Sequence, residues 1–198
     1  RIEYGYRDVR PYPLILSLSG QPFVDVRASL NSFIPASLPE ATAKRITNAY
    51  IKILADNSQY HDKIEFDVAY TIWTPDFSKS AKQRLIPYGV TDDDILLLQE
   101  SLKKITNNAL TRLHGDIQSI DQLDKRREMI IASELPAIDK AISLLDDCKR
   151  FGTLAFSHAA RAGFVATTLL KSLVAVGTMT DERRLAFLKS FSTVAGEF

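Results

Sequence analysis

Residues Pro22–Pro35 read PFVDVRASLNSFIP, and this stretch places polar side chains inside an otherwise apolar run. On an extended chain, successive side chains point to opposite faces of the strand. Phe23, Asp25 and Arg27 would therefore share one face, and the apolar residues between them would share the other. A charged face of this kind belongs either to a half-exposed strand or to a strand that contributes an acid and a base to a pocket.

The composition is that of a folded protein. The 198 residues are 45% hydrophobic and 25% charged, which is close to the averages of globular domains and unlike disordered, collagen-like or membrane-bundle sequences. This length is sufficient for one domain with its own hydrophobic core. The 25 basic and 24 acidic residues leave a net charge of +1. Because nucleic-acid phosphates are bound by concentrated Lys and Arg, we do not expect nucleic acid as a partner.

Cysteine usage and hydropathy bear on the location of the protein. Cys148 is the only cysteine, so we expect no internal disulfide, and we expect a cytoplasmic location. With one cysteine and only three histidines, we also expect no structural zinc site. The apolar stretch from His158 to Val176 contains Arg161 and Lys171, and its uninterrupted part is shorter than the ~20 residues that a membrane span needs. We therefore expect the central helix of a soluble bundle there, and no membrane partner.

Two short apolar runs predict a β-hairpin near the N-terminus. Residues 14–19 and 23–28 both have the composition of strands, and Gly20-Gln21-Pro22 between them favours a turn. The hairpin is expected to supply the first two strands of a small antiparallel sheet.

Residues 63–74 alternate apolar and polar side chains, which is the clearest strand pattern in the sequence. If this strand paired with residues 23–28, Glu65 and Asp67 would lie near Asp25, on the face that also carries a guanidinium group. The functional interpretation is a pocket for an anion or polar ligand. The structural interpretation is a solvated sheet face with cross-strand ion pairs.

Helical periodicity dominates the rest of the chain. We expect a first helix after the capping-box pair Ser37 and Glu40, ending near Asp56. Residues 75–89 are loop-like, with at most a short helix around residues 81–85. Five later helices are expected. The first begins at Thr91, with Asp94 completing a capping box, and ends near Gly115; the second spans residues 117–130; the third begins at Ser133 with Pro136 in its first turn. The fourth spans residues 158–176 with Gly177 as its stop, and the fifth begins at Thr180.

These patterns predict an α+β, mainly α fold, in which a bundle of about five helices packs with a small antiparallel sheet from the N-terminal third. We expect a single domain over residues 1–198, with a strand-containing part at 1–75 and a helical part at 76–198. The first residues, which begin at Arg1 rather than Met, read like the middle of a folded sequence. We expect an excised piece of a larger multidomain protein; the alternative is an independent protein with a trimmed start.

We find no catalytic or metal-binding motif. The eight glycines form neither a phosphate-binding loop nor a dinucleotide fingerprint, and there is no G-x-S-x-G elbow. Cys148 lies in the amphipathic context DDCKR, which favours a packing residue over a reactive thiolate. His158 has the chemistry of a general acid, a general base or a phosphoryl carrier, but its setting favours a capping or packing role. We expect no catalytic residue and no metal site in this chain.

Asp25, Arg27 and Asn31, with Arg161 as a further candidate, are the residues that we expect to bind a ligand. Arginine suits bidentate contacts to phosphate or carboxylate. Arg161 stands among small apolar residues, so it needs solvent, an acidic partner or an anionic ligand, and a structural ion pair is the alternative role. Aromatic residues interleaved with arginines near the N-terminus have the chemistry to stack on a base or sugar, or to anchor the chain on the core; they are Tyr4, Tyr6, Tyr12 and Phe23 with Arg7 and Arg10.

Five separated blocks of the sequence carry a resemblance to a known family. They are EYGYRDVRPYPL at residues 3–14, PFVDVRASLNSFIP at 22–35, HDKIEFDV at 61–68, SLKKITN at 101–107 and LLDDCKRFGTLAFSHAARAGFVA at 144–166. Together they resemble the middle region of phosphoenolpyruvate synthase-like proteins, the PEP/pyruvate-binding family. In that family an ATP-grasp domain precedes this region and a swivelling phosphohistidine domain follows it, so the resemblance implies these two flanking domains as partners.

The resemblance implies that the parent protein is an ATP-dependent phosphotransferase of the pyruvate, water dikinase type. ATP and Mg²⁺ would be cofactors of the parent, with none in this chain, and the piece alone would be inactive. Related dikinases insert a mainly helical acceptor-binding region at this place, which implies a linking and acceptor-binding role with a small-molecule acceptor. The family's catalytic residues lie outside this chain, so none is carried over.

Two other classes of function stay open. One is a non-catalytic structural or protein-interaction module whose polar residues only set domain geometry. The other is an independent small enzyme, which the sequence disfavours because no nucleophile and base stand at a usable spacing.

Overall fold

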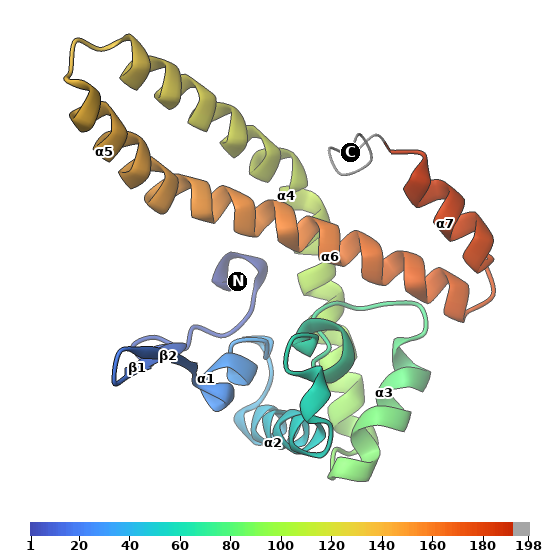
Figure 1. Ribbon diagram of the computed structural model, residues 1–198. Helices are drawn as coiled ribbons and strands as arrows, with labels where there is room; N and C mark the ends of the chain where they lie inside the picture. The colour runs from blue at the N-terminus through green and yellow to red at the C-terminus, as the bar shows by residue number, and fades with distance from the viewer. Residues whose placement is uncertain (192–198) are drawn as a thin grey trace. The chain divides into compact units, whose positions relative to one another are not determined.

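Figure 1 shows the computed structural model, which describes residues 1–191. This part of the chain has seven α-helices and one two-stranded antiparallel sheet near the N-terminus, which confirms the α+β, mainly α class. The chain divides into two compact units, one of residues 1–108 with 168 onward and one of residues 109–167. The boundary expected after residue 75 lies inside the first unit.

The first unit contains the hairpin and most of the helices. Its elements are β1 (Ile15–Leu18), β2 (Gln21–Val24), α1 (Val26–Asn31), α2 (Glu40–Asp56), α3 (Phe77–Leu85), the first part of α4 (Asp92–Ala132), the last part of α6 (Thr153–Ala175), α7 (Asp181–Lys189), 3-10 turns at Ile2–Tyr4, Ser58–Tyr60 and Ile86–Tyr88, and a π-helical turn at Ile64–Val68. The largest fully buried side chains of its core are Tyr6, Leu30, Ile34, Ile46, Tyr50, Val68, Phe77, Leu85, Ile95, Leu98 and Leu102.

The predicted hairpin is confirmed, but its second strand is shorter than expected. β1 and β2 pair antiparallel from Ile15 opposite Val24 to Leu18 opposite Gln21. Both turn residues, Ser19 and Gly20, have positive φ, which is the geometry of the two-residue turns that match strand twist. The prediction of a strand as far as residue 28 is wrong, because Asp25 caps α1 and the chain turns helical there. Every side chain of the two strands is exposed.

The predicted strand over residues 63–74 is wrong. Residues 64–68 form a π-helical turn, and residues 69–74 form neither a helix nor a strand. Side-chain hydroxyl groups form hydrogen bonds with backbone groups of this segment, in place of the backbone of a neighbouring strand. The Tyr70 amide donates to Tyr50 Oη at 3.1 Å, the Trp73 amide donates to Thr106 Oγ1 at 2.8 Å, and the Thr71 carbonyl accepts from the Tyr6 hydroxyl. A largely buried segment whose backbone groups are satisfied in this way needs no sheet.

The capping box that begins α4 is confirmed. The Thr91 amide donates to Asp94 Oδ2 at 3.1 Å, and the Asp94 amide donates to Thr91 Oγ1 at 3.2 Å. The predicted end near Gly115 is wrong, because α4 continues to Ala132. One glycine costs a helix only about 1 kcal/mol, and the surrounding residues are good helix formers.

Asp94 also joins α4 to α2. Its side chain is 1% exposed, and its carboxylate accepts from Thr42 Oγ1 at 2.7 Å and from Arg45 at 2.7 Å and 2.6 Å. The Arg45 hydrogen bonds hold the pKa of Asp94 well below its usual value, because they stabilise the charged form. This buried carboxylate therefore depends on partners from α2.

Two other helix starts differ from expectation. α2 begins at Glu40 with Pro39 as its N-cap, and the Ser37 hydroxyl donates to Ser101 Oγ at 2.9 Å in place of a capping box. α3 spans Phe77–Leu85 and is longer than the short helix expected around residues 81–85.

The signals around the end of α6 are confirmed. Gly177 has φ +75°, its amide donates to the Val174 carbonyl at 2.9 Å, and the Thr178 amide donates to the Leu173 carbonyl at 3.0 Å, which is a Schellman ending. Thr180 Oγ1 then accepts from the Arg183 amide at 3.2 Å and caps α7.

The second unit is a helical hairpin (Figure 1). One arm is the later part of α4. The other consists of α5 (Ala137–Asp147), a π-helical turn (Cys148–Gly152) and the first part of α6, which follow one another with helical backbone angles. Arg126 and Asp147 form an ion pair at 2.6 Å between the arms, and Lys140 Nζ donates to the Ile131 carbonyl at 2.7 Å.

Residues 117–130 belong to α4 rather than to a separate helix, and α5 begins at Ala137 rather than at Ser133. The central bundle helix expected over residues 158–176 corresponds to α6, which begins earlier, at Thr153, and within the expected range Phe164 is 39% exposed. No helix among residues 1–191 combines the length and the apolar character needed to cross a membrane.

We predict that Asp94→Ala lowers the free energy of unfolding by about 2 kcal/mol, because it removes a buried carboxylate that accepts hydrogen bonds from Thr42 and from the half-exposed Arg45. The folded pKa lies below the unfolded value of 3.8, so this stabilisation is complete above about pH 5, begins to fall near the unfolded pKa, and is lost as the pH falls through the lower folded pKa. Urea unfolding at about pH 7 and about pH 3 measures both effects, and the difference between wild type and variant should shrink at the lower pH.

Asp93→Ala is the matched control, because Asp93 is an exposed acid in the same helical turn. It should cost less than about 1 kcal/mol, the helix-dipole contribution of a surface acid. Equal losses in the two variants would contradict the role assigned to Asp94.

Candidate functional site

Three of the four predicted ligand-binding residues line one cavity of about 310 Å³ in the first unit. Its volume lies at the small end of the range of ligand pockets, roughly 300 to 1,000 Å³. We call it the N-terminal cavity. It is lined by Arg7, Asp8, Val9, Arg10, Tyr12, Asp25, Arg27, Ala28 and Asn31.

The start of α1 positions the predicted residues. Asp25 Oδ1 accepts from the Ala28 amide at 2.8 Å, which ends the strand and begins the helix. Arg27 and Asn31 are four residues apart in this helix and therefore lie on one side of it. The Asp25 amide donates to the Leu14 carbonyl at 3.0 Å, which fixes the end of the hairpin beside the helix.

The opposite wall is the loop of residues 7–12. The Arg7 amide donates to the Ile34 carbonyl at 2.8 Å, and Tyr6 forms an isolated bridge with Pro35. Tyr4 and Tyr6 are 3% and 1% exposed, so these two aromatic residues anchor the chain on the core. The loop that follows them is thereby held against the segment after α1.

Two of the three arginines at the cavity are paired with acids. Arg7 Nη2 lies 2.7 Å from Glu40 Oε2. Arg10 Nε lies 2.9 Å and 3.0 Å from the two carboxylate oxygens of Asp8. These side-chain hydrogen bonds lower the pKa of Asp8 to about 2 and the pKa of Glu40 below its usual value, because both stabilise the carboxylate form.

Arg27 differs from the other two arginines in the chemistry of its partner. Its Nη1 donates to Asn48 Oδ1 at 3.1 Å, and no acid among residues 1–191 forms an ion pair with it. Because an amide carries no charge, the positive charge of this exposed guanidinium is not neutralised. The cavity therefore presents one arginine that is oriented by the fold and able to pair with an anion.

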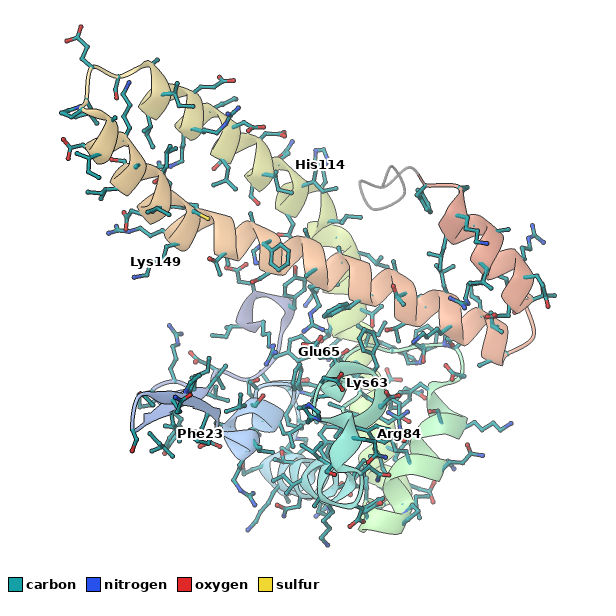
Figure 2. The ribbon with its side chains drawn as sticks, viewed as in Figure 1. Phe23, Lys63, Glu65, Arg84, His114 and Lys149 are labelled. Carbon is teal, nitrogen blue, oxygen red and sulfur yellow. The ribbon has the colours of Figure 1, made fainter. Side chains whose placement is uncertain are left out.

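The expected convergence of Asp25 with Glu65 and Asp67 is wrong. Glu65 and Asp67 line a different cavity, because residues 63–74 do not form a strand beside residues 23–28. Figure 2 labels Phe23 on the hairpin and Glu65 on the π-helical turn, and the two are well apart in the view. Glu65 instead forms an ion pair with Arg1 at 3.3 Å.

Arg161, the fourth predicted residue, belongs to α6 in the second unit and is 7% exposed. Sequence reasoning did not assign Arg7, Arg10 and Tyr12 to the same site as Asp25. The interleaving of aromatic and arginine residues near the N-terminus was the available signal. That pattern includes the buried anchors Tyr4 and Tyr6 as well as the cavity-lining residues Arg7, Arg10 and Tyr12. Only the folded structure shows which residue has which role.

Among residues 1–191, no group of three or more His, Cys, Asp or Glu side chains is arranged to hold a metal ion. Cys148 is exposed and forms no disulfide. No family model, curated protein or solved structure shows significant similarity to this chain.

We predict that Asp25→Ala lowers the free energy of unfolding by about 1 kcal/mol, because the variant loses the acceptor that caps α1. Asp25→Asn keeps a side-chain oxygen at the N-cap and should cost less than half of that. Urea unfolding of the three proteins measures the difference. Equal losses in both variants would show that the charge of Asp25 matters and its capping bond does not.

Proposed function

We propose that this chain is the linking and acceptor-binding region of a phosphoenolpyruvate synthase-like phosphotransferase, and that the N-terminal cavity binds the anionic group of the acceptor or of the phosphohistidine. The five sequence blocks support the family context. The arrangement of Asp25, Arg27 and Asn31 around one cavity supports ligand binding by this piece.

The observation that carries the proposal is the neutral partner of Arg27. A guanidinium group offers several donors in a planar fork that matches a phosphate or carboxylate, and the resulting charge-assisted bonds are about twice as strong as neutral ones. Asn48 already orients the Arg27 side chain. An incoming anion would therefore gain a charge-assisted contact without displacing an acid.

In this proposal the chain binds and positions, and the transfer chemistry belongs to flanking domains. Most of what a protein supplies to phosphoryl transfer is positioning and neutralisation of charge. The family resemblance assigns ATP and Mg²⁺ to the ATP-grasp domain of the parent. The lone cysteine supports a cytoplasmic location for this kinase-like transferase.

A structural module is the second candidate, and one observation favours it. Each of the three arginines at the cavity already has a partner within the chain: Glu40 for Arg7, Asp8 for Arg10 and Asn48 for Arg27. If these contacts are the whole purpose of the side chains, the cavity only sets the geometry of the hairpin and α1.

NMR titration of the 198-residue chain with inorganic phosphate and with pyruvate distinguishes the two candidates. We expect saturable shifts at the N-terminal cavity. Arg27→Ala should weaken binding by about tenfold or more, since a charged hydrogen bond contributes about 1.5 to 3 kcal/mol. In the full-length polypeptide the same variant should lower turnover while the unfolding temperature is unchanged.

Arg150→Ala is the matched control, because Arg150 is an exposed arginine of the second unit, paired with Asp146 at 2.8 Å. It removes the same charge from the chain and should leave phosphate and pyruvate binding unchanged. Absence of saturable binding, or equal weakening by both variants, would favour the structural module.

A further inference from the structure

The β-hairpin of the first unit has two open edges. Among residues 1–191, β1 pairs only with β2, so neither strand has a second neighbour there. Every side chain of the two strands is exposed, and the hairpin extends beyond α1, away from α2 and α3 (Figure 1). The open edge of a strand offers backbone donors and acceptors to a strand of another chain.

The register shows which backbone groups lie on the open edge of β1. The residues beside a two-residue turn form a hydrogen-bonded pair, and such pairs alternate with non-hydrogen-bonded pairs along an antiparallel ladder. The Asp25 amide donates to the Leu14 carbonyl at 3.0 Å, as this alternation requires. The N–H and C=O groups of Ile15 and Ser17 therefore point away from β2, and no backbone hydrogen bond within residues 1–191 occupies them.

The two edges differ in how they are protected against pairing. On β2 the outward-facing residues are Pro22 and Val24, and proline has no N–H to donate. Charged side chains are another common protection of an open edge. β1 reads Ile-Leu-Ser-Leu and contains neither proline nor a charged residue. The edge of β1 is therefore the one that can accept a neighbouring strand.

The edge of β1 is complementary to itself. When two copies lie antiparallel with Leu16 opposite Leu16, Ile15 of each copy lies opposite Ser17 of the other. These residues carry the outward-facing groups, so each such pair exchanges both of its hydrogen bonds. In the same register Leu14 lies opposite Leu18. Because β1 is uncharged, the two strands meet without like-charge repulsion.

The same register joins apolar side chains across the sheet. Leu16 and Phe23 are cross-strand partners in the hairpin and are 38% and 50% exposed. Pairing of two β1 strands places these two residues and their counterparts of the second copy in one row, on one face of a four-stranded sheet. Apolar cross-strand pairs stabilise sheets, and a two-stranded hairpin without further strands is only marginally stable. A second copy therefore supplies what the hairpin lacks.

We propose that β1 pairs antiparallel with β1 of a second copy of this chain, which gives a two-fold symmetric dimer with a four-stranded sheet. The two-fold axis passes beside Leu16, so both copies contribute the same residues to the interface. This dimer uses the edge of the hairpin and does not depend on the function proposed for the N-terminal cavity.

Disulfide cross-linking tests the register. In the dimer, Leu16 lies opposite its own copy at a non-hydrogen-bonded position, where Cα atoms are about 4.5 Å apart and a disulfide can form. In a Cys148→Ser background, Leu16→Cys should therefore give a covalent dimer on oxidation. Val24→Cys in the same background is the matched control. Val24 is also exposed, but its two copies lie three strand spacings apart in the dimer, at least about 14 Å.

Sedimentation of the wild-type chain under reducing conditions measures the association without a cross-link. The chain should change from monomer to dimer as its concentration rises from about 1 to 500 µM. Ser17→Pro should weaken the dimer by about tenfold or more, because it removes one outward-facing N–H from each copy. Val24→Pro removes the outward-facing N–H of β2 instead and should leave dimerisation unchanged. Urea unfolding checks that both variants fold, and the Leu16→Cys result stands without them.

Three results would overturn the proposal. The first is a wild-type chain that stays monomeric over this range, which would leave the edge of β1 for a strand of another protein. The second is cross-linking of Val24→Cys as fast as that of Leu16→Cys, which would indicate random collision. The third is equal weakening by Ser17→Pro and Val24→Pro, which would show that the association does not use the edge of β1.

Discussion

The carboxylate of Asp94 is the interaction on which the first unit depends. A buried charge is tolerated only when its partners are in place, and those partners, Thr42 and Arg45, lie on one side of α2. The same helix supplies Asn48, which orients Arg27, and Glu40, which pairs with Arg7. One helix, held in place through Asp94, therefore also positions two arginines of the N-terminal cavity.

The chemistry of its partner decides what a polar group can do. At the N-terminal cavity, the useful feature is a guanidinium whose orienting partner is neutral, so its charge remains for a ligand. Between the arms of the helical hairpin, an acid and an imidazole meet at 3.2 Å. The arrangement at the N-terminal cavity suits an anion.

Residues 69–74 show that a segment with an alternating pattern can be largely buried without joining a sheet. Hydroxyl groups of Tyr6, Tyr50 and Thr106 take the places of strand neighbours. The alternation of apolar and polar residues reports only that the segment is partly buried. Which atoms satisfy its backbone depends on distant parts of the chain, so the pattern alone predicts a strand that the fold does not form.

The fold class could be predicted from the pattern of the whole sequence, and four further features have local causes: the hairpin turn, the capping box of Thr91 and Asp94, the stop at Gly177 and the cap at Thr180. The grouping of Asp25, Arg27 and Asn31 was also local, since they are neighbours in one segment. Tertiary structure alone decided that Asp25 caps a helix, that α4 continues through Gly115, and that Asp116 meets His158. The physical reason is that a cap or turn is stabilised by residues a few positions away, whereas burial and long-range pairing depend on which surfaces the folded chain brings together.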